Sequence, residues 1–342
     1  MNAFTNFVRQ FLPGYFSVND WRFRELRERA AEKTLLAIAL ASGAAALLVL
    51  VFILKEAWPT WRHNGLGFLT RTGWDQQIVA AWTAPAGQPV WEFGALPLVA
   101  GTVYTTIGAL ALCLPAGVGC AIFLAEICPR QLRELFQSVV RLLAAIPSVI
   151  YGLVGLMVVV PWVRQTFITD ELALKMIRIC PLDGTGLLPG IVVLAAMIGP
   201  IFIALATDAL RSVPHSYKEA ALALGLSHWR AITLVMLPAA WKGILAGAIL
   251  AAAKAMGEAV AMAMVTGSVA HLPSLRHGWV FFLEPLRTLP AAIIDNAEGM
   301  TVPSIQSALF ACASVLLVSC ACLSFFSRLV TGLAYEGGVE RG

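Results

Sequence analysis

Residues 212–240 read SVPHSYKEAALALGLSHWRAITLVMLPAA and lie between two long hydrophobic stretches. Ser216 and Glu219 have the S-x-x-E spacing of a capping box, which predicts that a helix begins here. Gly225 tolerates a positive φ angle and can therefore turn the chain between two short helices. An apolar stripe at i, i+4 and i+7 comprises Leu222, Leu226 and Trp229. The segment is therefore either an amphipathic helix pair on a membrane surface or a surface that binds a partner protein.

The chain on both sides of this segment is strongly hydrophobic. Of its 342 residues, 59% are hydrophobic and 13% are charged, whereas a soluble domain has about 25% charged residues. A membrane-spanning helix needs about 20 mainly apolar residues. Six windows reach that length, the last of them with two charges inside: 34–54, 93–125, 142–163, 184–207, 299–327 and 243–267. We therefore predict an all-α integral membrane protein with six transmembrane helices.

The basic residues predict how these helices are oriented. Lys and Arg gather on the cytoplasmic side of a membrane. With the N-terminus inside, the cytoplasmic segments carry 15 basic residues and the periplasmic segments carry 8. Both termini are therefore expected in the cytoplasm, and the net charge of +4 reflects this bias rather than nucleic-acid binding. The expected parts are an interfacial segment 1–33, a first span 34–54, a Trp-rich periplasmic loop 55–92, a core 93–327 containing the loop 212–240, and a tail 328–342.

Two charged residues lie inside the window 243–267, in the stretch LAAAKAMGEAVAMAMV at 250–265. A charge at the bilayer centre costs about 2.5–3.5 kcal/mol on insertion scales, and such residues face a bundle interior or a water path. In a continuous helix Lys254 is near the middle, and Glu258 follows on the same face, where the two side chains can pair. They either line a path through the bundle or form an ion pair that only orients the helices.

Prolines interrupt three of the other spans. Pro115, Pro147 and Pro200 each lie within a predicted transmembrane segment. Breaks of this kind are tolerated where neighbouring helices or cavities satisfy the freed backbone groups. We therefore expect helix breaks near a path through the bundle.

Residues that carry chemistry are sparse in the predicted spans. Most of the seven cysteines lie in apolar segments, Cys180 is alone in an outside loop, and no C-x-x-C occurs. We therefore predict no metal site, no disulfide framework and no cofactor on this chain. All five histidines lie in loops, and the spans lack Asp, which argues against an intramembrane enzyme. None of the six lysines follows a glycine, so the chain has no P-loop for ATP.

The loop also carries a family pattern. Glu219-Ala220-Ala221, Gly225, Val235 and Leu237-Pro238 fit E-A-A-x3-G-x9-[I/V]-x-L-P. This pattern resembles the EAA loop of type I ABC importer permeases, the MetI-like bundles. The resemblance implies that Glu219, Ala220, Ala221 and Gly225 shape coupling helices that bind a separate cytoplasmic ATPase dimer.

Further stretches narrow the resemblance. The sequences ALPLVAGTVYTTIGALALCLPAGVGCAIFLAE, AAIPSVIYGLVGL and AKAMGEAVAMAMV look like the phosphate-specific permeases, and the long loop after the first span is similar to the PstC-type subunit. This implies a PstA-type partner permease, a periplasmic phosphate-binding protein and phosphate as the substrate. Lys254 stands where the family pattern has Arg, and Lys lacks the planar fork that binds phosphate in a bidentate manner. A mobile point charge or a gate pair is therefore expected at Lys254 and Glu258.

Two other functions remain open from the sequence. The same machine could carry another oxyanion, such as sulfate or molybdate, because the binding protein often sets substrate affinity in such importers. An ion-coupled secondary transporter would also explain charges within the membrane, but it would not explain the EAA loop.

Overall fold

The computed structural model describes residues 20–85 and 88–335, and the chain divides into two units after Lys55. Helix α2 (Asp20–Asn64) begins in the first unit and continues past the division. Among the described residues, six helices are long and apolar enough to cross a membrane. These spans are 30–64, 96–127, 148–167, 187–211, 228–256 and 303–326. The predicted number of six spans is confirmed.

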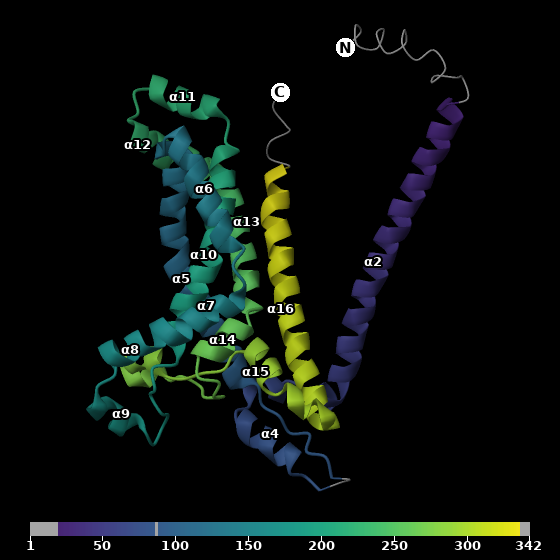
Figure 1. Ribbon diagram of the computed structural model, residues 1–342, viewed down its shortest axis with the longest axis vertical. Coiled ribbons are helices and arrows are strands. Elements are labelled where there is room, and N and C mark those ends of the chain that lie inside the picture. Colours follow the sequence, from purple (N-terminus) through teal and green to yellow (C-terminus); the bar gives the residue numbers. More distant parts are fainter. Residues whose placement is uncertain (1–19, 86–87, 336–342) are drawn as a thin grey trace. The chain divides into compact units, whose positions relative to one another are not determined.

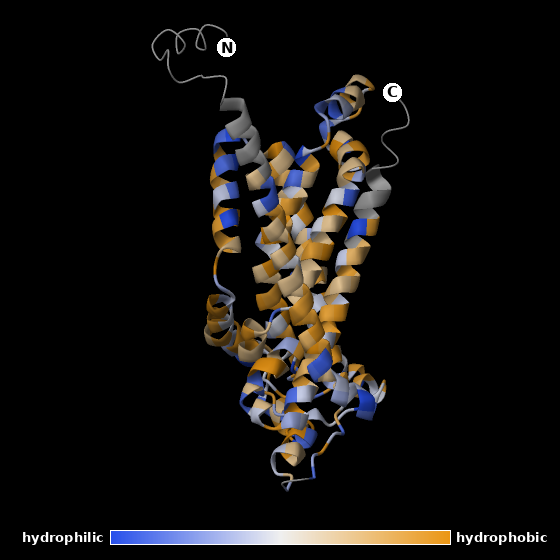
Figure 2. Ribbon diagram, turned by 90° about the vertical axis from the view of Figure 1, so that its right-hand side faces the viewer, coloured by the Kyte–Doolittle hydropathy of each residue, from blue (hydrophilic) through white to orange (hydrophobic). Residues whose placement is uncertain are grey.

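Long helices form the core of the second unit (Figure 1). They are α5 (Leu96–Ile122), α10 (Leu187–Arg211), α13 (Leu237–Met256) and α16 (Pro303–Tyr335). Helix α10 packs against α5 and α13, and α13 also packs against α16. Leu194, Ile198 and Phe202 of α10 are fully buried in the resulting core. Hydrophobic residues predominate along these helices, as Figure 2 shows, because their outer faces must meet lipid.

Only one of the three prolines breaks a helix. Pro115 lies inside α5 and Pro200 inside α10, and both helices continue through them, so the prediction of breaks at these two positions is wrong. Pro147 does separate α6 (Arg130–Ala144) from α7 (Ser148–Val154). Proline disfavours the helical conformation in the residue before it, which explains why α6 ends three residues earlier. The third span therefore begins at Ser148 rather than at residue 142.

Short elements gather at the end of the second unit where α10 begins, opposite the loop 212–240 (Figure 1). They are α3 (Gly67–Thr70), α4 (Trp74–Trp82), η2 (Gly155–Val159), α8 (Val160–Phe167), α9 (Asp170–Met176), α14 (Val260–Val265), η4 (Leu275–Leu283), α15 (Leu289–Asp295) and η5 (Ala297–Thr301). Arg287 lies 2.6 Å from Asp75 and 3.2 Å from Asp295, so ion pairs connect α4 and α15.

The Trp-rich segment is largely helical rather than an extended loop. It starts with the end of α2, and the side chain of Asn64 donates a hydrogen bond to the Trp91 carbonyl at 2.6 Å. Trp74 is fully buried, with its ring 6.0 Å from that of Phe93. Trp74, one of the five tryptophans of segment 55–92, is therefore a core residue and not part of an interfacial belt.

Candidate functional site

The loop 212–240 forms two short helices at the far end of the bundle. Helix α11 (His215–Ala223) and helix α12 (His228–Ala231) are joined by a turn in which Gly225 has a φ of +82°. The Gly225 N–H donates to the Leu222 carbonyl at 3.0 Å, and the Leu226 N–H donates to the Ala221 carbonyl at 3.2 Å. These two bonds form a Schellman motif, in which the residue after the helix adopts a left-handed conformation that favours glycine.

The predicted capping box is wrong. Helix α11 begins after Pro214, and no side-chain cap bond forms at its start. Ser216 therefore lies inside the helix, where its hydroxyl cannot take the N-cap position. The fixed φ of proline favours a helix start at this point, two residues earlier than the S-x-x-E spacing implies. Helix α12 does have a side-chain cap, because the Ser227 hydroxyl accepts a bond from the Arg230 N–H at 3.4 Å.

Apolar side chains at this end are exposed to solvent. Because the chain turns at Gly225, Leu222 and Trp229 lie on separate helices and do not form the single stripe predicted from their spacing. Both are exposed, as is Leu224 in the turn. Of the four residues that the resemblance assigns to ATPase coupling, Ala221 is buried, whereas Glu219, Ala220 and Gly225 are exposed. Exposed apolar residues beside exposed polar ones are typical of a protein-binding surface.

An ion pair ties α11 to the end of the second span. The Lys218 ammonium lies 2.5 Å from a carboxylate oxygen of Glu126, in the π-helical turn η1 (Phe123–Ile127) that follows α5. The Glu126 side chain is only 7% exposed and that of Lys218 is 21% exposed. The sequence did not predict this pair, although Glu126 is the charge that ends the second apolar window and Lys218 precedes the EAA residues directly.

Basic residues surround this ion pair. A pocket of about 200 Å³ opens beside it between η1, α6 and α10. Its charged and polar lining comprises Glu126, Arg130, Arg133, Arg211 and His215. The Arg133 guanidinium donates to the Cys128 carbonyl at 2.9 Å, which holds α6 against η1. The end of the bundle that carries α11 is therefore positively charged, as the predicted cytoplasmic orientation requires.

Lys254 and Glu258 do not share one continuous helix. Helix α13 ends at Met256, so Lys254 lies in its last turn, and a new helix, α14, begins at Val260. Gly257, a poor helix former, closes α13, and the Glu258 N–H turns back to the Ala255 carbonyl at 3.2 Å. The prediction of an unbroken fifth span with Lys254 near its middle is therefore wrong.

The two charges instead match the ends of the two helices. A cation is stabilised near the C-terminus of a helix and an anion near the N-terminus. Lys254 lies at the end of α13, and a carboxylate oxygen of Glu258 accepts a hydrogen bond from the Ala261 N–H of α14 at 3.1 Å. In the part of the chain that the structure describes, no ion pair joins Lys254 to Glu258, and Lys254 is exposed. Its charge is therefore available to a ligand or to another chain.

Comparison with known proteins gives the family. Residues 117–332 match the family described as binding-protein-dependent transport system inner membrane component. The chain belongs to this family. It is an importer permease of the ABC class and a multi-pass protein of the bacterial inner membrane, and the predicted family and location are confirmed.

Curated relatives of this permease resemble it over most of its length. It is 34% identical over 301 residues to the phosphate transport system permease protein PstC 1 of Mycobacterium tuberculosis, covering 84% of this chain and 85% of the relative. It is 32% identical over 301 residues to the probable ABC transporter permease protein YqgH of Bacillus subtilis, covering 86% and 88%. It is also 34% identical over 292 residues to the phosphate transport system permease protein PstC of Mesorhizobium japonicum, covering 80% and 83%.

The fold of the permease has a counterpart among solved structures. A chain of a bacterial ABC transporter involved in the import of the acidic polysaccharide alginate aligns with 90% of this chain and with 99% of its own length. The TM-score is 0.52 at 15% sequence identity, so the likeness concerns the fold alone. The predicted all-α bundle is thereby confirmed, and the family match identifies it as that of an importer permease.

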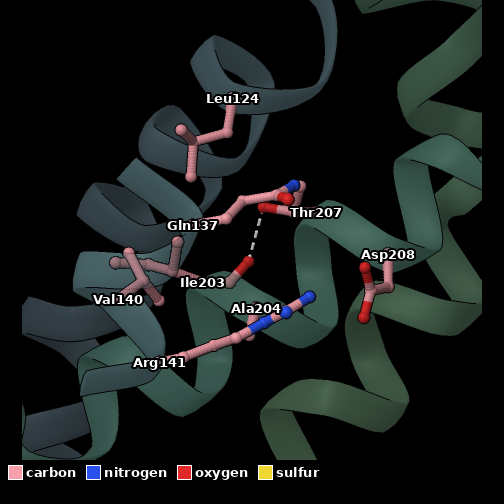
Figure 3. A pocket seen from close by; sticks show the side chains of 8 residues that line it. All are labelled: Leu124, Gln137, Val140, Arg141, Ile203, Ala204, Thr207 and Asp208. Atoms are coloured by element: carbon pink, nitrogen blue, oxygen red, sulfur yellow. Dashed lines mark hydrogen bonds between the residues drawn. The ribbon is translucent and has the colours of Figure 1, made fainter. Parts of the chain in front are cut away.

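A small pocket in the permease lies between η1, α6 and α10 (Figure 3). Its lining comprises Leu124, Gln137, Val140, Arg141, Ile203, Ala204, Thr207 and Asp208. The Thr207 hydroxyl donates to the Ile203 carbonyl at 2.6 Å and is thus already satisfied within its own helix. Its volume of about 30 Å³ has room for only one or two water molecules. This pocket is a gap in the packing rather than a site for an oxyanion.

Proposed function

We propose that this chain is a membrane-spanning subunit of an ATP-driven phosphate importer of the PstC type. The observation that carries the proposal is the identity of 32–34% with named phosphate permeases over at least 80% of the chain. Similarity that extends through the spans as well as the coupling loop supports a shared substrate, because side chains on the spans line the transport path. Competition by sulfate or molybdate in an uptake assay distinguishes phosphate from these alternative substrates.

The coupling loop is proposed to bind the ATPase. Glu219, Ala220, Ala221 and Gly225 shape the turn between α11 and α12, and the exposed apolar side chains around it form the surface that a partner would cover. ATP binding would close two ATPase copies around this loop and around the corresponding loop of a PstA-type partner. The ion pair between Lys218 and Glu126 would carry that movement to α5.

This chain would hydrolyse no ATP itself. The absence of a Gly-Lys sequence leaves it without the residues that cradle the phosphates of a nucleotide. A periplasmic phosphate-binding protein would deliver the substrate to the end of the bundle opposite α11, where the short elements gather. No resident cofactor is required for this activity.

Lys254 and Glu258 are proposed to line the translocation path. Lys254 is exposed and unpaired at the helix break in the described residues, so it can lower the barrier for an anion within the membrane. Glu258 is engaged by the Ala261 N–H and places a negative charge beyond the break, which would weaken the hold on the anion. A conducting site has to be favourable to enter and weak enough to leave. Pro147, at the break before α7, is the one predicted proline break that the structure retains.

The proposal is tested by uptake of radiolabelled phosphate in cells that express the whole system. Excess arsenate should compete, whereas excess sulfate and molybdate should not. Lys254→Ala should reduce uptake at least tenfold, Lys254→Arg should retain it, and Lys175→Ala, an exposed lysine of α9, serves as the matched control. Competition by sulfate or molybdate would overturn the substrate, and normal uptake by Lys254→Ala would remove this residue from the path.

A further inference from the structure

Three potential metal ligands meet at the end of the bundle where α10 begins. Cys180 lies in the segment between α9 and α10, His271 precedes η4, and Glu284 follows η4 directly. One ligand atom from each residue, the Cys sulfur, a His nitrogen and a carboxylate oxygen, lies within 4.8 Å of the other two. Cys180 is far from the other two residues in the sequence, so no motif of closely spaced ligands indicated a metal site.

Glu284 is the centre of this cluster and is fully buried. One of its oxygens, Oε2, lies 2.9 Å from the His271 Nε2 and accepts a hydrogen bond from the Ser274 N–H at 3.0 Å. Its other oxygen, Oε1, lies 2.5 Å from the His277 Nδ1. Burial of a carboxylate is unfavourable unless positive charge and hydrogen bonds compensate it. The two imidazoles and the Ser274 N–H lie against both carboxylate oxygens, and a divalent cation at this position would add a full positive charge to that environment.

Cys180 adds a soft ligand, because its sulfur lies within 4.8 Å of a His271 nitrogen and a Glu284 carboxylate oxygen. It is buried, and it packs in an apolar cluster with Val163, Met176 and Leu283. Burial, together with the negative charge of Glu284, raises the pKa of the Cys180 thiol to about 11. A divalent cation would stabilise the thiolate and the buried carboxylate together.

We propose that Cys180, His271 and Glu284 bind one Zn²⁺ ion, with a water molecule as the fourth ligand. In tetrahedral sites Zn²⁺ lies about 2.0–2.3 Å from N, O and S ligands. Ligand atoms of such a site are roughly 3.3–3.6 Å apart, so His271 and Glu284 need to separate by only a few tenths of an ångström. The combination of thiolate, imidazole and carboxylate selects Zn²⁺ over Mg²⁺ and Ca²⁺, which take oxygen ligands.

His277 completes the site as an outer partner. Its Nδ1 lies 2.5 Å from Oε1 of Glu284, whereas Oε2 lies 2.9 Å from the His271 Nε2, so His277 fixes the orientation of the carboxylate. The His271 and His277 side chains are 22% and 27% exposed, so solvent and ions reach the cluster from outside. Binding replaces the thiol proton by the metal and releases that proton to water. The ion would tie the segment before α10 to η4.

The test is metal binding by the complete transporter, purified with an affinity tag that lacks His and Cys. After treatment with a chelator, Co²⁺ is added as a spectroscopic probe, and Zn²⁺ is then added to displace it. The wild type should bind one Co²⁺ per copy of this chain with a thiolate-to-cobalt absorption band, and Zn²⁺ should remove that band. Cys180→Ser should lack the band, whereas Cys128→Ser, which removes another buried cysteine, should keep it.

Histidine variants provide a second arm in which the thiol remains. His271→Gln should abolish the band, and His277→Gln should weaken Co²⁺ binding about 10–100-fold, as removal of an outer partner does. If the wild type shows no thiolate band, or if Cys180→Ser retains it, no ion binds at Cys180 and the proposal is overturned. Because this readout involves no transport, its failure leaves the proposed phosphate uptake untouched.

Discussion

Removal of the Lys218 ammonium is the sharpest test of how the coupling loop is held. The substitution Lys218→Met keeps an unbranched side chain that lacks the ammonium group, and it leaves the Glu126 carboxylate, which is 7% exposed, without its partner at 2.5 Å. The gross attraction at this distance is about 7 kcal/mol with an effective dielectric constant of about 20. Most of it is offset by desolvation of the two groups.

The net effect lies between two known limits. Exposed ion pairs contribute about 0–1 kcal/mol, and removal of one partner of a buried pair costs about 3–5 kcal/mol. Glu126 is nearly buried, but the pocket beside it contains Arg130, Arg133 and Arg211, which partly compensate its charge. We therefore expect a loss of about 2 kcal/mol in the free energy that holds α11 against η1, or about 30-fold in the docking equilibrium.

Hydrogen–deuterium exchange of the α11 amides in the purified transporter measures this loss. Local opening becomes more frequent in Lys218→Met, so exchange in α11 should accelerate about 30-fold while exchange in α15 stays constant. Lys175→Met is the matched control on an exposed lysine. In a double-mutant cycle with Glu126→Gln, the coupling energy should be about 1–2 kcal/mol. Equal exchange rates in wild type and Lys218→Met would show that the ion pair does not hold α11 against η1.

Three other expectations concern conformation and packing. Gly225 has a φ of +82° and open space around it. Asn tolerates this left-handed conformation, so Gly225→Asn should keep ATPase activity coupled to transport, whereas Gly225→Val should uncouple them because the backbone strain costs about 1–2 kcal/mol. Equal coupling in both variants would contradict this. A Cβ at position 101 would lie 2.5 Å from the Arg287 carbonyl oxygen, so Gly101→Ala should lower thermal stability by about 1–3 kcal/mol, while Gly119→Ala, with no neighbour within 4 Å, should not. Arg287→Met should lower thermal stability by about 1–2 kcal/mol, because Asp75 and Asp295 lose their shared cation. An unchanged melting temperature would argue against that network.

The sequence by itself determined the number of spans and the family. Hydrophobic length is a local property, so charge-free windows identified six helices without knowledge of how they pack. The EAA pattern is also local, since its Gly225 is required by the Schellman turn at the end of α11. The sequence did not locate the helix start at His215, because the effect of Pro214 exceeded that of the Ser216 spacing.

The break between Lys254 and Glu258 was decided by tertiary structure. Both sides of Gly257 are equally apolar, so hydropathy continues smoothly across it, and a glycine alone does not end a membrane helix. Only the packing of α14 against α7 shows that the chain changes direction there. The charges that the sequence interpreted as a pair on one face are therefore charges at two helix ends.

The clusters at the two ends of the bundle depended entirely on the fold. Lys218 lies on α11 in the loop after the fourth span, whereas Glu126 lies at the end of the second span. Cys180 lies on a different segment from His271 and Glu284. Hydropathy and local spacing describe neighbours along the chain, whereas these contacts arise when α5, α10 and α13 pack side by side. The sequence determines which segments enter the membrane, and the packing of those segments decides which polar side chains meet outside it.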